Sequence, residues 1–389
     1  MEHDTWQSTV RVLMAEFAAR SGLDPAAKAP RRYLWTDAFA VCNFLELYRR
    51  TNDEKFRDLA LRLVSQVHAI LGRHRDDDPR TGWISGLGEE EGRRHPTIGG
   101  LRIGKDLNER GPGEPFNEHL EWERDGQYYH YLTKWMHALN RLSRVTGEAA
   151  YNVWALELAK TAHARFTSLP HRGGRKRMVW KMSIDLSRPL VTSMGQHDPL
   201  DGLVTFCQLQ ATASQEFAGT AAPRLDAEIL ELAGICNGRS LATDDPLGLG
   251  GLLFDACRMA QLRCLGVFEP AGLLVDVLEA ARLGLESYAS GNPLRLPAEY
   301  RLAFRELGLA IGLQGVERMK KLVEQHPGAF APAVLPLVEV LERYAPLGET
   351  IEGFWVGWKN RDDAGRSEHR EINSVMLVTS LAPQGFLTI

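Results

Sequence analysis

The stretch that decides the fold is Leu47–His68, LYRRTNDEKFRDLALRLVSQVH, because it returns at Leu142–His163 as LSRVTGEAAYNVWALELAKTAH. The two copies align without a gap. In each copy one helix ends, a tight turn follows at Thr51-Asn52 or Thr146-Gly147, and an amphipathic helix begins. A helical hairpin that recurs along a chain predicts an array of hairpins, in which each hairpin buries its apolar face against its neighbours.

The predicted helices are of two kinds. Apolar residues lie nearly all round the segments 35–51 and 126–146, which predicts helices buried on most sides. The segment 53–71 carries one apolar stripe and charged residues elsewhere, which is typical of a helix that faces water. Alternation of the two kinds would place six inner helices inside six outer ones. We therefore predict an all-α fold, an (α/α)6 toroid of six helical hairpins with inner and outer helices alternating.

Connection lengths agree with this architecture. Helical periodicity predicts twelve principal helices, at 5–20, 35–51, 53–71, 126–146, 148–166, 199–218, 224–239, 250–264, 271–288, 298–312, 330–345 and 368–381. Turns from inner to outer helices are short, whereas the connections 72–125, 167–198 and 346–367 are long. Long loops in compact domains are usually functional, so we expect the site where they meet the N-termini of the inner helices. Since no segment has a linker composition, we predict a single domain over 1–389.

Composition limits the class of protein. Hydrophobic residues make up 44% and charged residues 25%, as in ordinary globular proteins. The formal charge of -4 gives no reason to expect nucleic acid or an anionic membrane as a partner. No stretch reaches the roughly 18 to 20 apolar residues of a membrane-spanning helix, and the N-terminus does not resemble a signal peptide. Five widely spaced cysteines indicate reduced core thiols in a cytoplasmic protein. The oligomeric state is left open.

Several chemical motifs are absent from the sequence. There is no GxGxxG after a strand, no P-loop, no HExxH, no GxSxG and no paired CxxC. The histidines and carboxylates have no spacing that specifies a metal site. The sequence therefore predicts neither a metal nor a cofactor.

Carboxylates and histidines gather at the starts of predicted inner helices. Helix capping or the helix dipole would account for the aspartates, and a core position would account for His130. A toroid, however, brings the starts of its inner helices together around one mouth. We therefore predict that five of these residues share one polar cavity as catalytic residues: Asp37, Asp125, His130, His197 and Asp198.

Aromatic and polar side chains near the same helix starts and long loops suit a carbohydrate ligand. A sugar offers apolar ring faces for stacking and hydroxyl groups for hydrogen bonds. The residues predicted to bind substrate are Trp35, Trp83, Gln127, Tyr128, Lys181, Asp201, Trp355 and His369.

Four segments carry a resemblance to a known superfamily. They are WTDAF at Trp35–Phe39, TNDEKF at Thr51–Phe56, DGQY at Asp125–Tyr128 and TGEAAY at Thr146–Tyr151. They resemble the six-hairpin glycosidase-like superfamily, whose members include glycoside hydrolases, unsaturated glucuronyl hydrolases and the N-acylglucosamine 2-epimerase group. The resemblance concerns architecture over most of the chain, and no complete catalytic motif of a single family is matched. It implies an (α/α)6 fold and an enzyme of carbohydrate metabolism.

The predicted function is that of a carbohydrate-active enzyme, glycoside hydrolase-like, acting on a sugar, an oligosaccharide or a related polyhydroxylated small molecule. Hydrolysis needs one carboxylic acid and one carboxylate base or nucleophile, for which Asp37, Asp125 and Asp198 are the candidates. A sugar epimerase or isomerase would instead use His130 and His197 as proton carriers. Two further alternatives are a non-catalytic toroid that binds a sugar or peptide, and a metal-dependent biosynthetic enzyme on the same fold.

Overall fold

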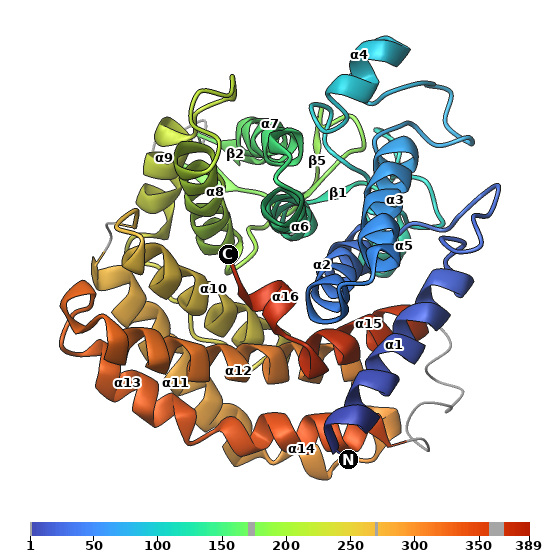
Figure 1. The fold of residues 1–389 in the computed structure, drawn as a ribbon. Coiled ribbons are helices and arrows are strands. Elements are labelled where there is room, and N and C mark those ends of the chain that lie inside the picture. Colours follow the sequence, from blue (N-terminus) through green and yellow to red (C-terminus); the bar gives the residue numbers. More distant parts are fainter. Residues whose placement is uncertain (1, 170–175, 269–270, 358–368) are drawn as a thin grey trace. The chain divides into compact units, whose positions relative to one another are not determined.

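The computed structural model (Figure 1) describes residues 2–169, 176–268, 271–357 and 369–389. The chain divides into two compact units. The middle unit is Ala18–Asn237, and the terminal unit combines Met1–Phe17 with Gly238–Ile389. The prediction of one domain over 1–389 stays a prediction.

Three helical hairpins build the middle unit. They are α2 (Leu34–Thr51) with α3 (Glu54–Leu71), α6 (Tyr129–Thr146) with α7 (Ala149–Phe166), and α8 (Asp198–Gln215) with α9 (Asp226–Cys236). The first helix of each pair also packs on its counterpart in the next, α2 on α6 and α6 on α8. Successive hairpins are therefore joined through their inner helices, as the sequence predicted.

The repeated turns adopt the same geometry. Asn52 (φ 53°) and Gly147 (φ 75°) both lie in the left-handed region, and each N–H donates to the carbonyl four residues earlier. The hydroxyls of Thr51 and Thr146 also donate to carbonyls four residues earlier, both at 2.8 Å. Left-handed caps of this kind end a helix by satisfying its last carbonyls. The sequence repeat is therefore a structural repeat.

Burial separates the two kinds of helix. Every residue from Leu34 to Leu47 of α2 is buried, whereas α3 buries only a stripe that includes Ala60, Leu63 and Val67. The second helix of the later hairpins, like α3, is exposed on part of its surface. Apolar residues on all sides lead to burial on all sides, and a single stripe leads to a surface helix. The prediction of inner and outer helices is confirmed for the segments 35–51, 126–146 and 53–71.

The terminal unit is also helical. Its elements are α1 (Glu2–Arg20) as far as Phe17, α10 (Pro246–Cys264), α11 (Ala271–Gly291), α12 (Ala303–Gln325), α13 (Val334–Glu342), α14 (Ala345–Val356), α15 (Arg370–Leu381), α16 (Gln384–Leu387) and short 3₁₀ turns at Pro293–Arg295, Ala298–Tyr300 and Pro327–Ala329. Helices α10 and α12 pack closely because glycines line their contact: a Cβ on Gly250 would lie 2.1 Å from the carbonyl oxygen of Gly308. Glycine, which has no Cβ, is therefore required at this position.

Several predicted boundaries are wrong. The predicted helix 298–312 begins later and runs longer, as α12, and 330–345 shortens to α13. The predicted loop 346–367 contains most of α14, which packs on α12, while its residues 358–367 lie outside the described ones. Pro346, Gly348 and Gly353 favour a loop locally, and tertiary packing overrides that propensity.

Short strands and helices replace part of the predicted loops in the middle unit. Gln127 and Tyr128, expected at the start of a helix, form a strand instead. Strands β1 (Gln127–Tyr128), β4 (Lys181–Met182) and β5 (Pro189–Val191) form an antiparallel sheet in that order, and β2 (Thr167–Ser168) pairs with β3 (Arg177–Met178). The 72–125 connection contains α4 (Glu89–Arg94) and α5 (Glu118–Glu123). Among the described residues, no helix has the length and apolar character to cross a membrane.

Candidate functional site

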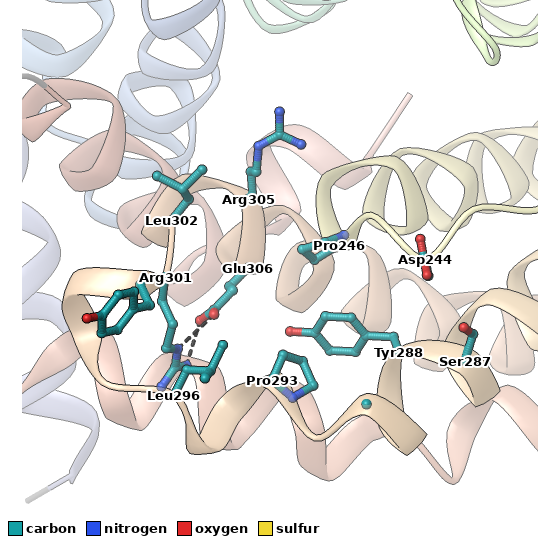
Figure 2. Close-up of a pocket in the computed structure, with 12 residues that line it drawn as sticks. Asp244, Pro246, Ser287, Tyr288, Pro293, Leu296, Arg301, Leu302, Arg305 and Glu306 are labelled. Carbon is teal, nitrogen blue, oxygen red and sulfur yellow. Dashed lines mark hydrogen bonds and ion pairs between the residues drawn. The ribbon is translucent and has the colours of Figure 1, made fainter.

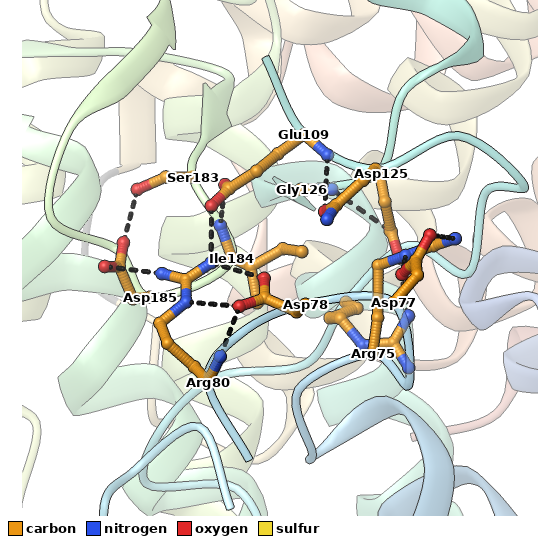
Figure 3. Close-up of polar contacts among 12 residues, drawn as sticks. Arg75, Asp77, Asp78, Arg80, Glu109, Asp125, Gly126, Ser183, Ile184 and Asp185 are labelled. Carbon is orange, nitrogen blue, oxygen red and sulfur yellow. Dashed lines mark hydrogen bonds and ion pairs between the residues drawn. The ribbon is translucent and has the colours of Figure 1, made fainter. Parts of the chain in front are cut away.

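Arg80 is one of the residues that join the two long loops of the middle unit (Figure 3). The Arg80 guanidinium lies 2.7 Å from a carboxylate oxygen of Asp78, 2.7 Å from one of Glu109 and 2.8 Å from one of Asp185. The other Glu109 oxygen accepts the N–H of Ile184 at 2.6 Å. Loops 72–125 and 167–198 therefore meet, as the sequence predicted for two of its three long loops.

Two of the predicted catalytic residues form a close pair beside these loops. His130 lies in the first turn of α6 and Asp198 is the first residue of α8, and the packing of α6 on α8 brings them together. His130 Nδ1 is 3.8 Å from Asp198 Oδ1. This separation is too long for a direct hydrogen bond, but it lets one small polar group of a ligand contact both side chains.

Aromatic rings surround His130. Its ring stacks on Tyr128 at 5.5 Å between centroids, and it meets Tyr131 edge-on at 4.9 Å and Trp35 at 6.0 Å. About a third of the His130 side chain (35%) remains exposed. The histidine is therefore held by packing while one side stays open to a ligand.

The environment displaces the two pKa values in opposite directions. Burial, with the neighbouring Asp201 carboxylate, raises the pKa of Asp198 to about 7, against the opposing effect of Lys134. Burial and Lys134 lower the pKa of His130 to about 4, which Asp201 opposes. Between these values the imidazole is neutral and the carboxyl is protonated. One side chain can then accept a proton and the other can donate one.

A second buried group lies next to this pair. The Lys134 ammonium is 2.7 Å from Asp201 Oδ2, and the Thr133 hydroxyl donates to the same oxygen. Asp201, predicted to bind substrate, is thus bonded to the protein. Asp198 differs, since its Oδ2 has no hydrogen-bond partner among the described residues. The absence of a side chain at Gly195 leaves room for the Asp198 carboxyl, because a Cβ on residue 195 would lie 2.3 Å from Asp198 Oδ2.

A pair of tryptophans continues the aromatic surface. Trp122 and Trp180 stack with centroids 5.1 Å apart, and Trp180 contacts Tyr128 at 5.2 Å. Trp122 is 50% exposed.

Sequence analysis missed Trp122, Lys134 and Thr133. The signal was present for Lys134, which lies one helical turn after His130 and is the only Lys, Arg, Asp or Glu between positions 126 and 140.

Asp37 is bonded to residues other than His130 and Asp198. Its carboxylate accepts the N–H of Tyr33, the N-cap residue of α2, at 3.0 Å and lies 3.5 Å from the Arg32 guanidinium. Both charged side chains are buried. These contacts are those of a helix-start carboxylate.

Asp125 is fully buried and accepts several hydrogen bonds. It is not the N-cap of a helix, although helix capping was one explanation that the sequence offered for it. One of its oxygens accepts from Arg102 at 2.6 Å and from Arg75 at 3.4 Å. The other accepts the N–H groups of Gly104 and Gly126, both at 3.0 Å. The N-cap of α6 is Tyr128. Asp125 therefore binds the 72–125 loop to the start of the sheet.

Gln127 and Lys181 are also bonded within the protein. The Gln127 amide donates to the carbonyls of Gly99 and Ile184, and its oxygen accepts the N–H of Leu101. The Lys181 ammonium is buried 2.9 Å from a Glu121 carboxylate oxygen, and burial lowers its pKa. Neither side chain has a free polar group to offer a ligand in this arrangement.

The remaining predicted residues occupy separate surroundings. Trp83 packs under the Arg73 guanidinium at 4.4 Å, and His197 is the half-buried N-cap residue of α8, next in sequence to Asp198. In the terminal unit, Trp355 donates to a Glu306 carboxylate oxygen at 2.7 Å, and His369 lies against Phe304 at the start of α15. Within the described residues, no three His, Cys, Asp or Glu side chains are grouped to hold a metal ion.

Comparison with solved structures identifies the fold. A structure of D-mannose isomerase matches 96% of this chain and 97% of its own with a TM-score of 0.51 and 11% sequence identity. The chain shares its fold with D-mannose isomerase. The predicted all-α fold class, the (α/α)6 toroid, is confirmed by this likeness.

Two further structures match with lower scores. Cellobiose 2-epimerase from Spirochaeta thermophila covers 87% of this chain and 85% of its own, with 13% identity and a TM-score of 0.46. A sugar epimerase from a ruminal bacterium covers 81% of this chain and 75% of its own, with 10% identity and a TM-score of 0.40. No protein-family profile and no curated protein matches the chain.

Proposed function

We propose that this protein is a carbohydrate-processing enzyme that moves a proton within a sugar, as an epimerase or isomerase. The observation that carries the proposal is the 3.8 Å separation of His130 Nδ1 and Asp198 Oδ1. Because their pKa values are about 4 and about 7, the imidazole is neutral and the carboxyl is protonated at a pH between these values. In this proposal His130 is the base and Asp198 is the acid.

The proposed reaction begins on an open-chain sugar. His130 takes the proton from the carbon beside the carbonyl group while Asp198 gives its proton to the carbonyl oxygen, which leaves a neutral enediol. In the second half Asp198 recovers a proton from an enediol hydroxyl and His130 returns its proton to carbon. Return to the same carbon, after the enediol has turned its other face toward His130, gives the epimer, and return to the neighbouring carbon gives the isomer. Both side chains end in their starting protonation states.

The surroundings of the pair support a sugar as the substrate. Trp35 and Tyr128 form walls beside His130, and the stacked Trp122 and Trp180 extend the aromatic surface outward. Aromatic faces bind the apolar faces of sugar rings. The solved structures that resemble this chain are named as a D-mannose isomerase and two sugar epimerases. The fold alone does not give the reaction, so the pair is the stronger support.

Four of the other predicted site residues have a structural role in this proposal. Asp37, Asp125, Gln127 and Lys181 hold the protein around the site, because their polar groups are already bonded. We further propose that the partner is a sugar or small oligosaccharide in the cytoplasm, in keeping with five cysteines that form no disulfide. The likeness to D-mannose isomerase spans both units, which supports the proposal of one domain over 1–389.

Solvent exchange tests the proposed reaction. The protein would be incubated in D2O with D-mannose, D-glucose, D-fructose and cellobiose, and deuterium at the carbon beside the carbonyl followed by NMR. We expect deuterium incorporation and an epimeric or isomeric product for at least one sugar. H130Q and D198N should each lower the rate by about 10²–10⁴-fold, and kcat/KM should fall on both sides of a maximum between pH 4 and 7.

Two exposed positions provide matched controls. H119Q and D58N make the same chemical changes at exposed sites of the middle unit, and we expect them to retain the rate of the unmodified protein. No exchange with any of the four sugars would overturn the proposal for this substrate class. Exchange that survives both H130Q and D198N would overturn the assignment of the pair.

Hydrolysis of a glycosidic bond is the second candidate function. The raised pKa of Asp198 suits the general acid of a glycosidase. The nearby carboxylate, Asp201, is bonded by Lys134 and Thr133, which disfavours it as the base or nucleophile. Release of new reducing ends from oligosaccharides without solvent exchange at carbon would favour hydrolysis over the proposed proton transfer.

A further inference from the structure

The terminal unit contains a pocket of about 360 Å³, lined entirely by residues between Asp244 and Glu306 (Figure 2). It lies where α10 and α12 begin and α11 ends. Its apolar walls are formed by Pro246, Pro293, Leu296 and Leu302. This volume falls in the lower part of the range for small-molecule sites, which combine apolar walls with a few polar groups.

A buried ion pair forms one side of the pocket. Arg301 donates to both carboxylate oxygens of Glu306, from Nε at 2.8 Å to Oε1 and from Nη2 at 2.6 Å to Oε2. Trp355 donates to Oε2 as well, at 2.7 Å. A carboxylate can accept about four hydrogen bonds, so Oε1 retains the capacity to accept one more.

Tyr288 supplies a second polar group. Figure 2 shows its ring between Pro246 and Pro293 with the hydroxyl directed toward Glu306. The side chain is 7% exposed, and the hydroxyl has no hydrogen-bond partner among the described residues. Burial, and then the Glu306 charge, raise the pKa of Tyr288, so the hydroxyl stays protonated. A buried hydroxyl without a partner costs free energy, and a ligand can remove that cost.

We propose that this pocket binds a small neutral hydroxylated molecule of the sugar or polyol class. A ligand hydroxyl can donate to Glu306 Oε1 and accept from Tyr288, so one group satisfies both. The apolar walls suit the C–H faces of such a molecule, and Ser287 and Asp244 at the lining offer further partners for hydroxyl groups.

Charged ligands fit the same groups less well. An anion could accept from Tyr288 but would meet the carboxylates of Glu306 and Asp244, while the nearby Arg305 is paired with Asp245. An ammonium group could donate to Glu306 but would leave the Tyr288 O–H without an acceptor. Only a group that both donates and accepts uses the two sites together.

Binding of methyl α-D-glucopyranoside tests the proposal. Its blocked anomeric carbon prevents ring opening, so it does not undergo the proton transfer proposed for His130 and Asp198, and binding is read separately from turnover. Saturation-transfer NMR on the full chain should detect the sugar, and titration should give its Kd. Y288F should weaken binding about tenfold by removing one hydrogen-bonding group, equivalent to about 1.4 kcal/mol. G291L should also weaken it, because Gly291 lines the pocket and has open space for a side chain.

Matched variants outside the pocket separate this effect from unfolding. Y344F removes a hydroxyl and G272L adds the same side chain elsewhere in the terminal unit, and both should bind as the unmodified protein does. D58N, at an exposed carboxylate outside both the pocket and the His130–Asp198 pair, should also bind unchanged. No binding to the unmodified protein, or equal binding to Y288F and G291L, would overturn the pocket assignment. Tighter binding of choline or acetate than of the glucoside would overturn the ligand class.

Discussion

Lys134 and Asp201 form a buried ion pair, with Nζ 2.7 Å from Oδ2, directly beside the His130–Asp198 pair. Lys134 opposes the rise of the Asp198 pKa and contributes to the fall of the His130 pKa. This ammonium group therefore adjusts both groups of the proposed acid and base without being either of them.

Replacing Lys134 by methionine should destabilise the protein. The change leaves Asp201 buried without its cation, and breaking a buried pair in this way costs about 3–5 kcal/mol. Urea unfolding at pH 7 measures the loss. The double variant K134M/D201N should recover most of it, because the unpaired charge is then gone. A loss below about 1 kcal/mol for K134M alone would contradict a strong coupling between the two residues.

Asp198→Asn should stabilise the protein in alkaline solution. The pKa of Asp198 is raised by folding from 3.8 to about 7, so the native state holds this proton more tightly than the unfolded chain. The contribution of Asp198 to the free energy of unfolding therefore falls as pH rises from about 4 to 7. Asparagine removes that loss, by an amount on the order of 1–4 kcal/mol at pH 8.

Urea unfolding of the D198N variant at pH 5 and pH 8 checks this sign. The gain over the unmodified protein should be large at pH 8 and small at pH 5, where the carboxyl is already mostly protonated. D58N, at an exposed carboxylate, should show no such difference. An equal effect of D198N at both pH values would mean that the Asp198 pKa is not raised.

Asp125→Asn should act on stability rather than on turnover. Asp125 accepts charged hydrogen bonds from Arg102 and Arg75 and two backbone N–H groups in a fully buried position. Asparagine removes the charge and turns one acceptor into a donor, at a cost of about 3–5 kcal/mol. Denaturant unfolding gives the loss, and turnover per folded molecule should stay within a few fold. A large fall in turnover with unchanged unfolding would restore Asp125 as a catalytic candidate.

The repeated turn can be tested at its left-handed position. Gly147→Ala should destabilise the protein by about 1 kcal/mol, because φ of 75° strains any side chain even though the space is open. Gly234→Ala is the matched control in the exposed part of α9, where alanine should stabilise by about 0.5–1 kcal/mol. Thermal unfolding compares the two. Stabilisation by both changes would contradict the strain at Gly147.

Much of the candidate site was visible in the sequence, but the bonding of its members was not. His130 and Asp198 were predicted together because both stand at the start of an inner helix, and they are a pair in the structure. Asp37 and Asp125 stand at similar positions and make other contacts, with Arg32 and Arg102. Sequence position places a carboxylate near a helix end, but the arginines that bind it come from distant segments.

The sequence by itself determined the repeating hairpin, since a Thr and a left-handed Asn or Gly end each helix through contacts within a few residues, and the apolar pattern of α2 and α3 assigns them to inner and outer positions. Local hydrogen bonds and periodicity follow from neighbouring residues alone. Tertiary structure decided which polar side chains remain free. Asp201 is bonded by Lys134 from another helix, whereas one oxygen of Asp198 has no partner among the described residues. That difference depends on the packing of α6 against α8, which contacts between neighbouring residues do not fix.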